Sequence, residues 1–383
     1  MSAPTLLYLV TEDWFFWSHR LPIARAARDA GFRVVVATRE DAHGARIRNE
    51  GFVLAPIRLR RRSWSPIAEL AAIRDLVGLY RRERPAIVHQ VAMKPVVYGT
   101  WAARRASVPA IVDALDGLGF VYGSTRPAAR LLRWPVSLAL GWALGRPNVH
   151  VHLQNEDDRA MLARVGALRH GRVSIIRGAG IDLAHFTPLP EPPGPFTVAI
   201  AARMIAEKGI DDLVEAIRRL VASGTPARLL IAGAPDRDSP TAIPEPTLGA
   251  WGALPFVEWR GHVADVRTVW ADAHVCALPS SGEGLPKALL EAAACGRALI
   301  ATDVPGNREV VRHEDTGLLV PYRDPGALTA ALARLAHDPA TRQGMASSAR
   351  RMVEREFSEA VVAAKTLALY RSLLPPAEAA NLS

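Results

Sequence analysis

The chain has 383 residues, of which 49% are hydrophobic, and a formal net charge of +9. A length and composition of this kind indicate a globular protein with two or three domains. No apolar run reaches the roughly 20 residues that a transmembrane helix needs, so the sequence excludes such a helix. Glu12 and Asp13 directly follow the apolar N-terminal run, which we expect to be a first strand rather than a signal peptide.

The positive charge is concentrated in the first half of the chain. Residues 1–180 contain 27 Lys and Arg against 14 Asp and Glu, a net of +13, whereas residues 181–383 have a net charge of −4. A basic half predicts an anionic partner, such as nucleic acid, anionic lipid or a lipid diphosphate. Cys276 and Cys295 lack the spacing of a metal site and predict free, buried thiols in a reducing cytoplasm.

Strands and helices alternate along the first half. Predicted strands span residues 6–10, 32–38, 53–57, 86–89, 110–113, 149–153 and 173–176, and predicted helices span 21–30, 66–82, 96–106, 127–144 and 157–164. Helices that separate apolar strands are typical of a parallel sheet covered on both faces.

Five prolines between Arg177 and Pro195 predict a linker, which we place at residues 181–195. A second alternating series follows, with strands at 197–201, 227–232, 257–259, 274–278, 298–301 and 318–320 and helices at 211–222, 266–272, 286–294 and 325–374. Two doubly wound halves of similar size predict a ligand cleft between them.

Two carboxylates stand out between Ser280 and Val311. Glu283 lies in a loop, and Glu291 lies along the helix that we expect to start at Pro286. The free N–H groups of a helix start bind phosphate, and carboxylates on either side suit hydroxyl groups. This arrangement suits a nucleotide sugar, although the residues alone are equally compatible with a surface helix carrying two ordinary glutamates.

The segment Glu283-Gly-Leu-Pro-Lys-Ala-Leu-Leu-Glu291 resembles the E-x7-E motif of the retaining glycosyltransferases of family 4. Members of this family have the GT-B fold, in which two Rossmann-like, doubly wound α/β domains face each other across a cleft. The resemblance therefore implies an acceptor-binding domain at residues 1–180, a linker at 181–195, a donor-binding domain at 196–356 and a C-terminal helix at 357–383 that crosses back to the first domain.

Two further segments fit the same family in order and spacing. Arg203 and Lys208, within AARMIAEKG, resemble the pair that grips the donor diphosphate. Gly261-His262-Val263, with Asp265 nearby, resembles the loop that meets the nucleotide base.

The resemblance also implies roles for the side chains. Arg203 and Lys208 would neutralise the diphosphate leaving group without a metal or other cofactor, although exposed charges at a turn are the simpler alternative. Glu291 would hold the ribose hydroxyls, and the backbone of residues 284–286 (Gly284, Leu285 and Pro286) would line the phosphates. Glu283 would orient the transferred sugar, because in this family the leaving phosphate is thought to help to deprotonate the acceptor.

Candidate residues of the first domain are less specific. His89 is expected to end its strand and resembles a family histidine that contacts the sugar or acceptor, although a structural bond explains it equally well. With it, the predicted catalytic residues are Glu283, His89, Arg203 and Lys208. Lys94 is a candidate contact to an acceptor phosphate.

The first loop departs from the glycine-rich turn that is usual in the family. Residues 11–20 carry four aromatic side chains, which predict either an apolar surface for a lipid-linked acceptor or a plug between domains. His19 and Arg20 should begin the next helix and meet an acceptor diphosphate. Asp116, in the segment 114–120 that resembles an acceptor-side loop, is a candidate to assist the acceptor hydroxyl.

Two basic segments predict contact with a membrane surface. Residues 126–146 mix arginines with Leu, Val and two Trp, and Pro135 should kink or split this helix. Arg58, Arg60, Arg61 and Arg62, with Trp64, would add attraction to anionic lipid. A core-facing helix and a solvated strand end are the alternatives.

The sequence thus predicts a retaining glycosyltransferase that moves a sugar from a UDP-sugar to a polyprenyl-diphosphate-linked or other glycan acceptor in the synthesis of a bacterial surface polysaccharide. An N-acetylhexosamine is one candidate sugar, and the expected location is the inner face of the cytoplasmic membrane, without nucleic acid as a partner. The alternatives are a UDP-sugar 2-epimerase of the same fold, a protein that binds nucleic acid or an anionic surface, and an inactive scaffold.

Overall fold

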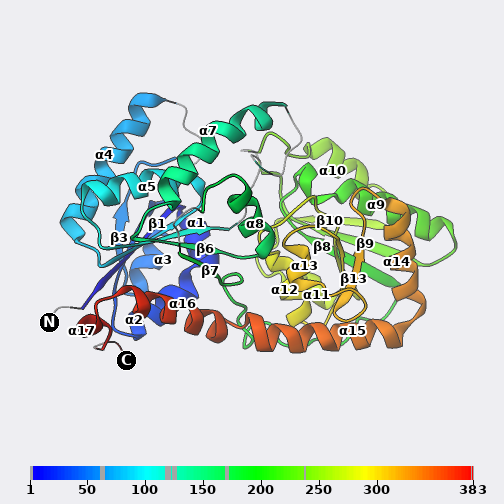
Figure 1. Cartoon of the computed structure of the whole chain (residues 1–383). Coiled ribbons are helices and arrows are strands. Elements are labelled where there is room, and N and C mark those ends of the chain that lie inside the picture. The colour runs from blue at the N-terminus through cyan, green and yellow to red at the C-terminus, as the bar shows by residue number, and fades with distance from the viewer. Residues whose placement is uncertain are drawn as a thin grey trace. The chain divides into compact units, whose positions relative to one another are not determined.

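The protein is described from a computed structural model, which describes residues 3–60, 65–116, 122, 127–168, 172–236, 239–380 and 382. The chain divides into two compact units (Figure 1). Unit 1 comprises Met1–Gly180 together with Glu359–Ser383, and unit 2 comprises Ile181–Ser358. Each unit is built on one parallel sheet flanked by helices, so the predicted α/β class is confirmed.

Unit 1 has a seven-stranded sheet in the order β3-β2-β1-β4-β5-β6-β7. Its central strands are apolar on both faces, as in residues 6–9 of β1, because helices cover both sides. The strands are β1 (Thr5–Glu12), β2 (Arg33–Arg39), β3 (Val53–Pro56), β4 (Ile87–Val91), β5 (Ala110–Leu115), β6 (Val149–Leu153) and β7 (Arg172–Ile175).

Two hydrophobic cores form on the two faces of this sheet. One is closed by α4 (Pro66–Glu83), α5 (Met93–Arg105) and α7 (Pro127–Leu144). The other is closed by α1 (Asp13–His19), α2 (Leu21–Asp29) and α16 (Glu359–Leu373). α16 comes from the end of the chain and packs on α2, as Figure 1 shows. The unit also contains α3 (Gly44–Asn49), α8 (Glu156–Arg164) and α17 (Pro376–Ala379).

Unit 2 has a six-stranded parallel sheet in the order β10-β9-β8-β11-β12-β13. The strands are β8 (Phe196–Ala201), β9 (Ala227–Ala232), β10 (Val257–Gly261), β11 (Val275–Leu278), β12 (Ala298–Thr302) and β13 (Gly317–Val320). The helical segments are η1 (Ala206–Lys208), α9 (Ile210–Ala222), α10 (Glu245–Gly252), α11 (Arg267–Ala271), α12 (Lys287–Ala294), α13 (Asn307–Val310), α14 (Pro325–His337), α15 (Pro339–Met352) and the π-helical turn η2 (Val353–Phe357).

The sequence prediction is wrong in several places. Residues 11–20 do not form a loop, because residues 13–19 form α1, in which Phe16 enters the core and Trp14 faces outward. Of the two outcomes expected at Pro135, the split does not occur, because α7 continues through this residue. The sequence also missed α3 and α10, which are short or rich in Gly and Pro and so give a weak helical signal.

Two loops at the carboxyl edge of the unit 2 sheet approach each other so closely that only glycine fits. Gly209, at the end of η1, has a φ of +66°, and a Cβ there would lie 2.1 Å from the carbonyl oxygen of Pro279. The loop after β8 therefore rests directly on the backbone that follows β11.

We expect Gly209→Ala to destabilise unit 2 strongly, by about 3 kcal/mol or more, because left-handed backbone strain adds to a backbone clash. Gly224→Ala is the matched control, since Gly224 has a φ of +94° but no atom within 4 Å of its Cβ position. The control should lose about 1 kcal/mol, the cost of the strain alone. Chemical denaturation measures both, and equal losses would show that the close approach is not a constraint.

Candidate active site

The candidate site of unit 2 is built from loops at the carboxyl edge of its sheet. Strands β8, β11 and β12 are neighbours, and the loops that follow them carry Lys208, Glu283 and Gly306 respectively. Because parallel strands end at the same edge, these loops come together there. This is the edge at which open α/β sheets bind ligands.

Lys208 and Glu283 form an ion pair at the centre of this edge. Lys208 Nζ lies 2.7 Å from Glu283 Oε1, and the two side chains are only 16% and 12% exposed. The structure thus brings together two residues that lie far apart in the sequence. A mostly buried cation and carboxylate hold each other in place where neither is fully solvated.

Arg203 has a different partner. Its Nη1 donates to Asp236 Oδ2 at 2.6 Å, and about half of the side chain is exposed. Asp236 follows β9, and no sequence pattern had marked it as part of the site. The two predicted diphosphate-binding cations are therefore held by separate carboxylates from separate loops.

The backbone beneath Glu283 is fixed by the loop after β12. The N–H of Glu283 donates to the carbonyl of Pro305, and a Cβ on Gly306 would lie 2.3 Å from the carbonyl oxygen of Glu283. The buried Asn307 donates through Nδ2 to the carbonyl oxygen and Oγ1 of Thr302, each at 3.1 Å. Sequence reasoning had assigned these supporting residues no role, although Pro-Gly-Asn after a short strand is a turn signal.

The helix start that was predicted to bind phosphate is present, one residue later than expected. Pro286 is the N-cap residue of α12, and the helix begins at Lys287. Gly284 and Leu285 lead into it from the Glu283 loop. The first N–H groups of a helix lack partners within the helix, so this end of α12 carries a partial positive charge beside Glu283.

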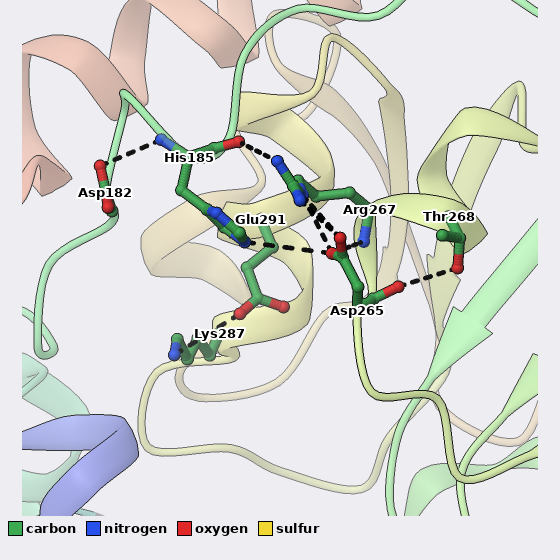
Figure 2. Close-up of polar contacts among 7 residues, drawn as sticks. All are labelled: Asp182, His185, Asp265, Arg267, Thr268, Lys287 and Glu291. Carbon is green, nitrogen blue, oxygen red and sulfur yellow. Dashed lines mark hydrogen bonds and ion pairs between the residues drawn. The ribbon is translucent and has the colours of Figure 1, made fainter. Parts of the chain in front are cut away.

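Glu291 lies in the second turn of α12 and is largely buried. Its Oε1 is 3.5 Å from Nζ of Lys287, one turn earlier (Figure 2). Burial raises the pKa of Glu291, and Lys287 only partly offsets this effect. A carboxylate in this state gains from any ligand hydroxyl that donates to it.

Near Glu291, Asp265 lies against two basic side chains (Figure 2). Arg267 Nη2 lies 2.5 Å from Asp265 Oδ2, and His185 Nε2 lies 3.9 Å from Oδ1 (Figure 2). Hydrogen bonding by Arg267 lowers the pKa of Asp265 to about 2. His185 comes from the segment at 181–195 that was predicted to be a linker and that here belongs to unit 2.

The other residues of the predicted base-binding loop lie close to Asp265 in the chain. Gly261 ends β10 with a φ of +64°, so the strand runs two residues further than predicted. His262 is exposed, whereas Val263 packs partly against the core of unit 2.

In unit 1, the prediction that His89 ends its strand is wrong. β4 continues to Val91, and the imidazole is fully buried on the face that α16 covers. Its Nδ1 lies 2.6 Å from Tyr370 Oη, and Tyr370 Oη lies 3.0 Å from Tyr8 Oη. Burial lowers the pKa of His89 well below its ordinary value. The structural bond that was the alternative for this residue is therefore present, and the ring has no exposed surface for a sugar.

Arg20 and Asp116 form a buried ion pair at the carboxyl edge of the unit 1 sheet. Arg20 is fully buried between α1 and α2, and its Nη2 donates to Asp116 Oδ2. Gln154 Nε2 donates to the other carboxylate oxygen at 2.8 Å. Burial alone would raise the pKa of Asp116, but Arg20 holds it below its ordinary value.

The remaining acceptor-side candidates also have partners. His19 ends α1 rather than beginning α2, and its ring stacks on Phe15 with centroids 4.2 Å apart. Lys94, in the first turn of α5, bonds to Glu69 Oε1 at 2.8 Å and to the carbonyl of Arg60 at 2.7 Å.

Some predicted segments cannot be placed. Residues 117–120 of the acceptor-side loop, together with Arg61, Arg62, Trp64 and Arg126, lie outside the described residues. Within the described part of the chain, no helix is long and apolar enough to span a bilayer. The same residues contain no group of three His, Cys, Asp or Glu that could hold a metal ion.

Two family models match the chain, one in each unit. The model described as "Glycosyl transferase 4-like" matches residues 5–142, and the model described as "Glycosyl transferases group 1" matches residues 195–338. This chain belongs to the family 4 glycosyltransferases. The enzyme class predicted from the E-x7-E segment is therefore confirmed. The group 1 model matches unit 2, which contains the Lys208–Glu283 pair.

Similar proteins agree with this assignment. The chain is 24% identical over 364 residues to the N,N'-diacetylbacillosaminyl-diphospho-undecaprenol alpha-1,3-N-acetylgalactosaminyltransferase of Campylobacter jejuni, covering 92% of this chain and 94% of that protein. It is 23% identical over 291 residues to the UDP-Gal:alpha-D-GlcNAc-diphosphoundecaprenol alpha-1,3-galactosyltransferase of Escherichia coli, covering 72% and 73%. The solved structure of Anabaena HepE in complex with UDP and glucose matches with a TM-score of 0.78 at 16% identity, covering 96% of this chain and all of that one. The predicted GT-B fold is thus confirmed.

We expect Lys208→Ala to lower the rate of sugar transfer by about 100-fold or more, because a preorganised cation beside a leaving group contributes on this scale. The double variant Lys208→Met/Glu283→Gln separates two roles of the lysine. If Lys208 only neutralised Glu283, the neutral pair would bind UDP as the wild type does, because UDP lacks the sugar that Glu283 is expected to orient, whereas we expect UDP binding to stay weak. Arg334→Ala, which breaks an exposed ion pair with Glu314, is the control and should transfer normally.

Unit 1 should lose stability in mild acid because of buried His152. Burial, followed by the charge of Arg20, lowers the pKa of His152 from 6.5 to about 4. Between these values His152 of the unfolded chain binds a proton that the folded chain does not, so this residue lowers stability by about 3 kcal/mol at most as the pH falls from 6.5 to 4.

His152→Gln should flatten this part of the profile of unfolding free energy against pH, measured by denaturation at each pH. His313→Gln, at an exposed histidine of unit 2, should leave the profile as in the wild type. A profile that is the same with and without His152 would contradict the assignment.

Proposed function

We propose that this glycosyltransferase moves a sugar from a UDP-sugar to a glycan linked to a polyprenyl diphosphate, with retention of anomeric configuration. Both relatives named above act on sugars linked to undecaprenyl diphosphate, by their names, and form alpha linkages. The HepE complex contains UDP, which makes a uridine nucleotide the first donor to test. An N-acetylhexosamine is a candidate sugar, as in the name of the Campylobacter relative.

The observation that carries this proposal is the Lys208–Glu283 pair beside the start of α12. A donor diphosphate at the helix start would accept hydrogen bonds from the first N–H groups of α12. It would also compete with Glu283 for the ammonium group of Lys208. Arg203, on the same loop, adds a second cation. Two cations and a helix start supply the charge that a metal would otherwise provide, so we propose transfer without a metal cofactor.

The reaction balances without an enzyme nucleophile. The bond between the sugar C1 and the UDP β-phosphate oxygen breaks, and a bond forms between C1 and the acceptor hydroxyl oxygen on the same face. The acceptor proton passes to the leaving phosphate, and UDP departs. The protein's part is to hold the reactants in this geometry and to stabilise negative charge as it develops on the diphosphate.

In this proposal the two glutamates bind different parts of the donor. Glu283 would accept from hydroxyls of the transferred sugar once Lys208 turns to the diphosphate. Glu291 would accept from the ribose hydroxyls, which would replace part of the solvation that it lost on burial. The enzyme would work at the inner face of the cytoplasmic membrane in the synthesis of a bacterial surface polysaccharide.

A donor panel tests the proposal. The purified protein is given UDP-GalNAc, UDP-GlcNAc, UDP-Gal and UDP-Glc, each with and without a polyprenyl-diphosphate-linked sugar and each with and without EDTA. We expect acceptor-dependent UDP release with one donor, unchanged by EDTA, and an alpha-linked product by NMR. Glu291→Ala should weaken UDP binding by about tenfold or more, the scale of a lost charged hydrogen bond, as measured by calorimetry.

Other outcomes would replace this proposal. An epimerised sugar formed without acceptor would identify an epimerase of the same fold. The absence of both UDP release and UDP binding would identify an inactive scaffold. A beta-linked product would overturn retention alone, and inhibition by EDTA would overturn transfer without a metal.

A further inference from the structure

Large apolar side chains are exposed on two helices of unit 1. Ile67 and Leu70 of α4 and Leu131, Trp134 and Leu138 of α7 are between 55% and 83% exposed. They include all of the large hydrophobic side chains in the described residues that are more than half exposed. Side chains of this kind normally occur singly on a protein surface, so a group on two helices that both pack on α5 indicates a binding surface.

The spacing of these residues places them on the outer side of each helix. Ile67 and Leu70 are three positions apart, and Leu131, Trp134 and Leu138 follow the i, i+3, i+7 pattern of one helical face. The opposite sides of the same helices enter the core, through residues such as Leu76 in α4 and Leu140 in α7. Both helices are therefore apolar on two sides, although only one side is covered by protein.

These apolar stripes lie in one layer and toward one edge of the sheet. Helices α4 and α7 both pack on α5, and all three close the same core (Figure 1). Helices α4 and α7 follow β3 and β5 respectively, so the first turns of both lie at the carboxyl edge of the parallel sheet. Ile67, Leu70, Leu131 and Trp134 belong to the N-terminal halves of their helices and thus to this edge. We call these residues, with Leu138, the α4–α7 face.

The charges around the α4–α7 face are mostly positive. α7 contains two arginines and no acidic residue, and Arg60 and Arg74 are exposed on or just before α4. The nearby acids are already engaged, since Glu69 pairs with Lys94 and Asp75 pairs with Arg58. Apolar side chains surrounded by basic residues suit the surface of an anionic bilayer, where acyl chains and negatively charged headgroups meet.

A second copy of the chain fits this surface less well. In a twofold-symmetric dimer the basic residues of one copy would face the same basic residues of the other, and like charges repel. A membrane instead offers acyl chains for the apolar residues and phosphates for the arginines in one plane.

We propose that the α4–α7 face docks on the surface of an anionic membrane, with its apolar side chains in the headgroup and upper acyl region. This inference rests on the proposed function only because a lipid-linked acceptor would be located in the membrane. The face lies at the same sheet edge as Asp116 and Lys94, so docking would bring a membrane-embedded acceptor diphosphate to the edge that holds these residues.

Co-sedimentation of the full chain with lipid vesicles tests this inference. The vesicles contain phosphatidylcholine alone or with phosphatidylglycerol, and no glycan acceptor. We expect binding to the anionic vesicles that weakens at about 0.5 M salt. Ile67→Ser/Leu70→Ser and Leu131→Ser/Trp134→Ser should each weaken partitioning by about tenfold or more. Arg60→Glu/Arg74→Glu should weaken binding to the anionic vesicles only.

Val53→Ser is the matched control, because Val53 is an exposed apolar residue of the same unit at the start of β3, on the opposite sheet edge. It should bind vesicles as the wild type does, and all variants should keep wild-type UDP binding if the wild type binds UDP.

Wild-type vesicle binding by both apolar double variants, or no vesicle binding by the wild type, would overturn the inference. So would a dimer, seen by ultracentrifugation, that the same substitutions dissociate. A protein that binds vesicles but transfers no sugar would overturn the proposed function and leave docking intact.

Discussion

The close approach of three loops at the carboxyl edge of the unit 2 sheet is the constraint on which the candidate site depends. Gly209 leaves room for the Pro279 carbonyl, and Gly306 leaves room for the Glu283 carbonyl. Without these contacts the loops after β8 and β11 would stand further apart. The 2.7 Å contact between Lys208 and Glu283 is therefore a consequence of backbone packing as much as of attraction between charges.

Each unit carries an ion pair at the carboxyl edge of its sheet, but the two pairs differ in burial and therefore in the role that they can have. Arg20 is fully buried, so removing Asp116 would leave an uncompensated charge at a cost of about 3–5 kcal/mol. That pair is suited to holding α2 and β5 in place. Lys208 and Glu283 keep some exposure, and a ligand can therefore reach them and take over one partner.

The sequence predicted the regular elements well where the apolar pattern was long. The bounds of α7, β6 and β9 agree with prediction to the residue, and the E-x7-E spacing correctly placed Glu291 on a helix. Prediction failed where tertiary contacts decide. Nothing in the spacing of residues 11–20 shows that Phe16 would enter a core and draw its neighbours into a helix.

The partners of the site residues were the least predictable part, because each comes from a distant segment. Asp236 meets Arg203 only because β9 lies beside β8, and His185 reaches Asp265 only because the chain after unit 1 folds onto unit 2. A motif read along one segment records residue types but not which carboxylate each cation will face. A lysine held by Glu283 is only 16% exposed, whereas an arginine held by Asp236 is about half exposed. The different exposure of the two cations thus follows from their partners, which the motif does not record.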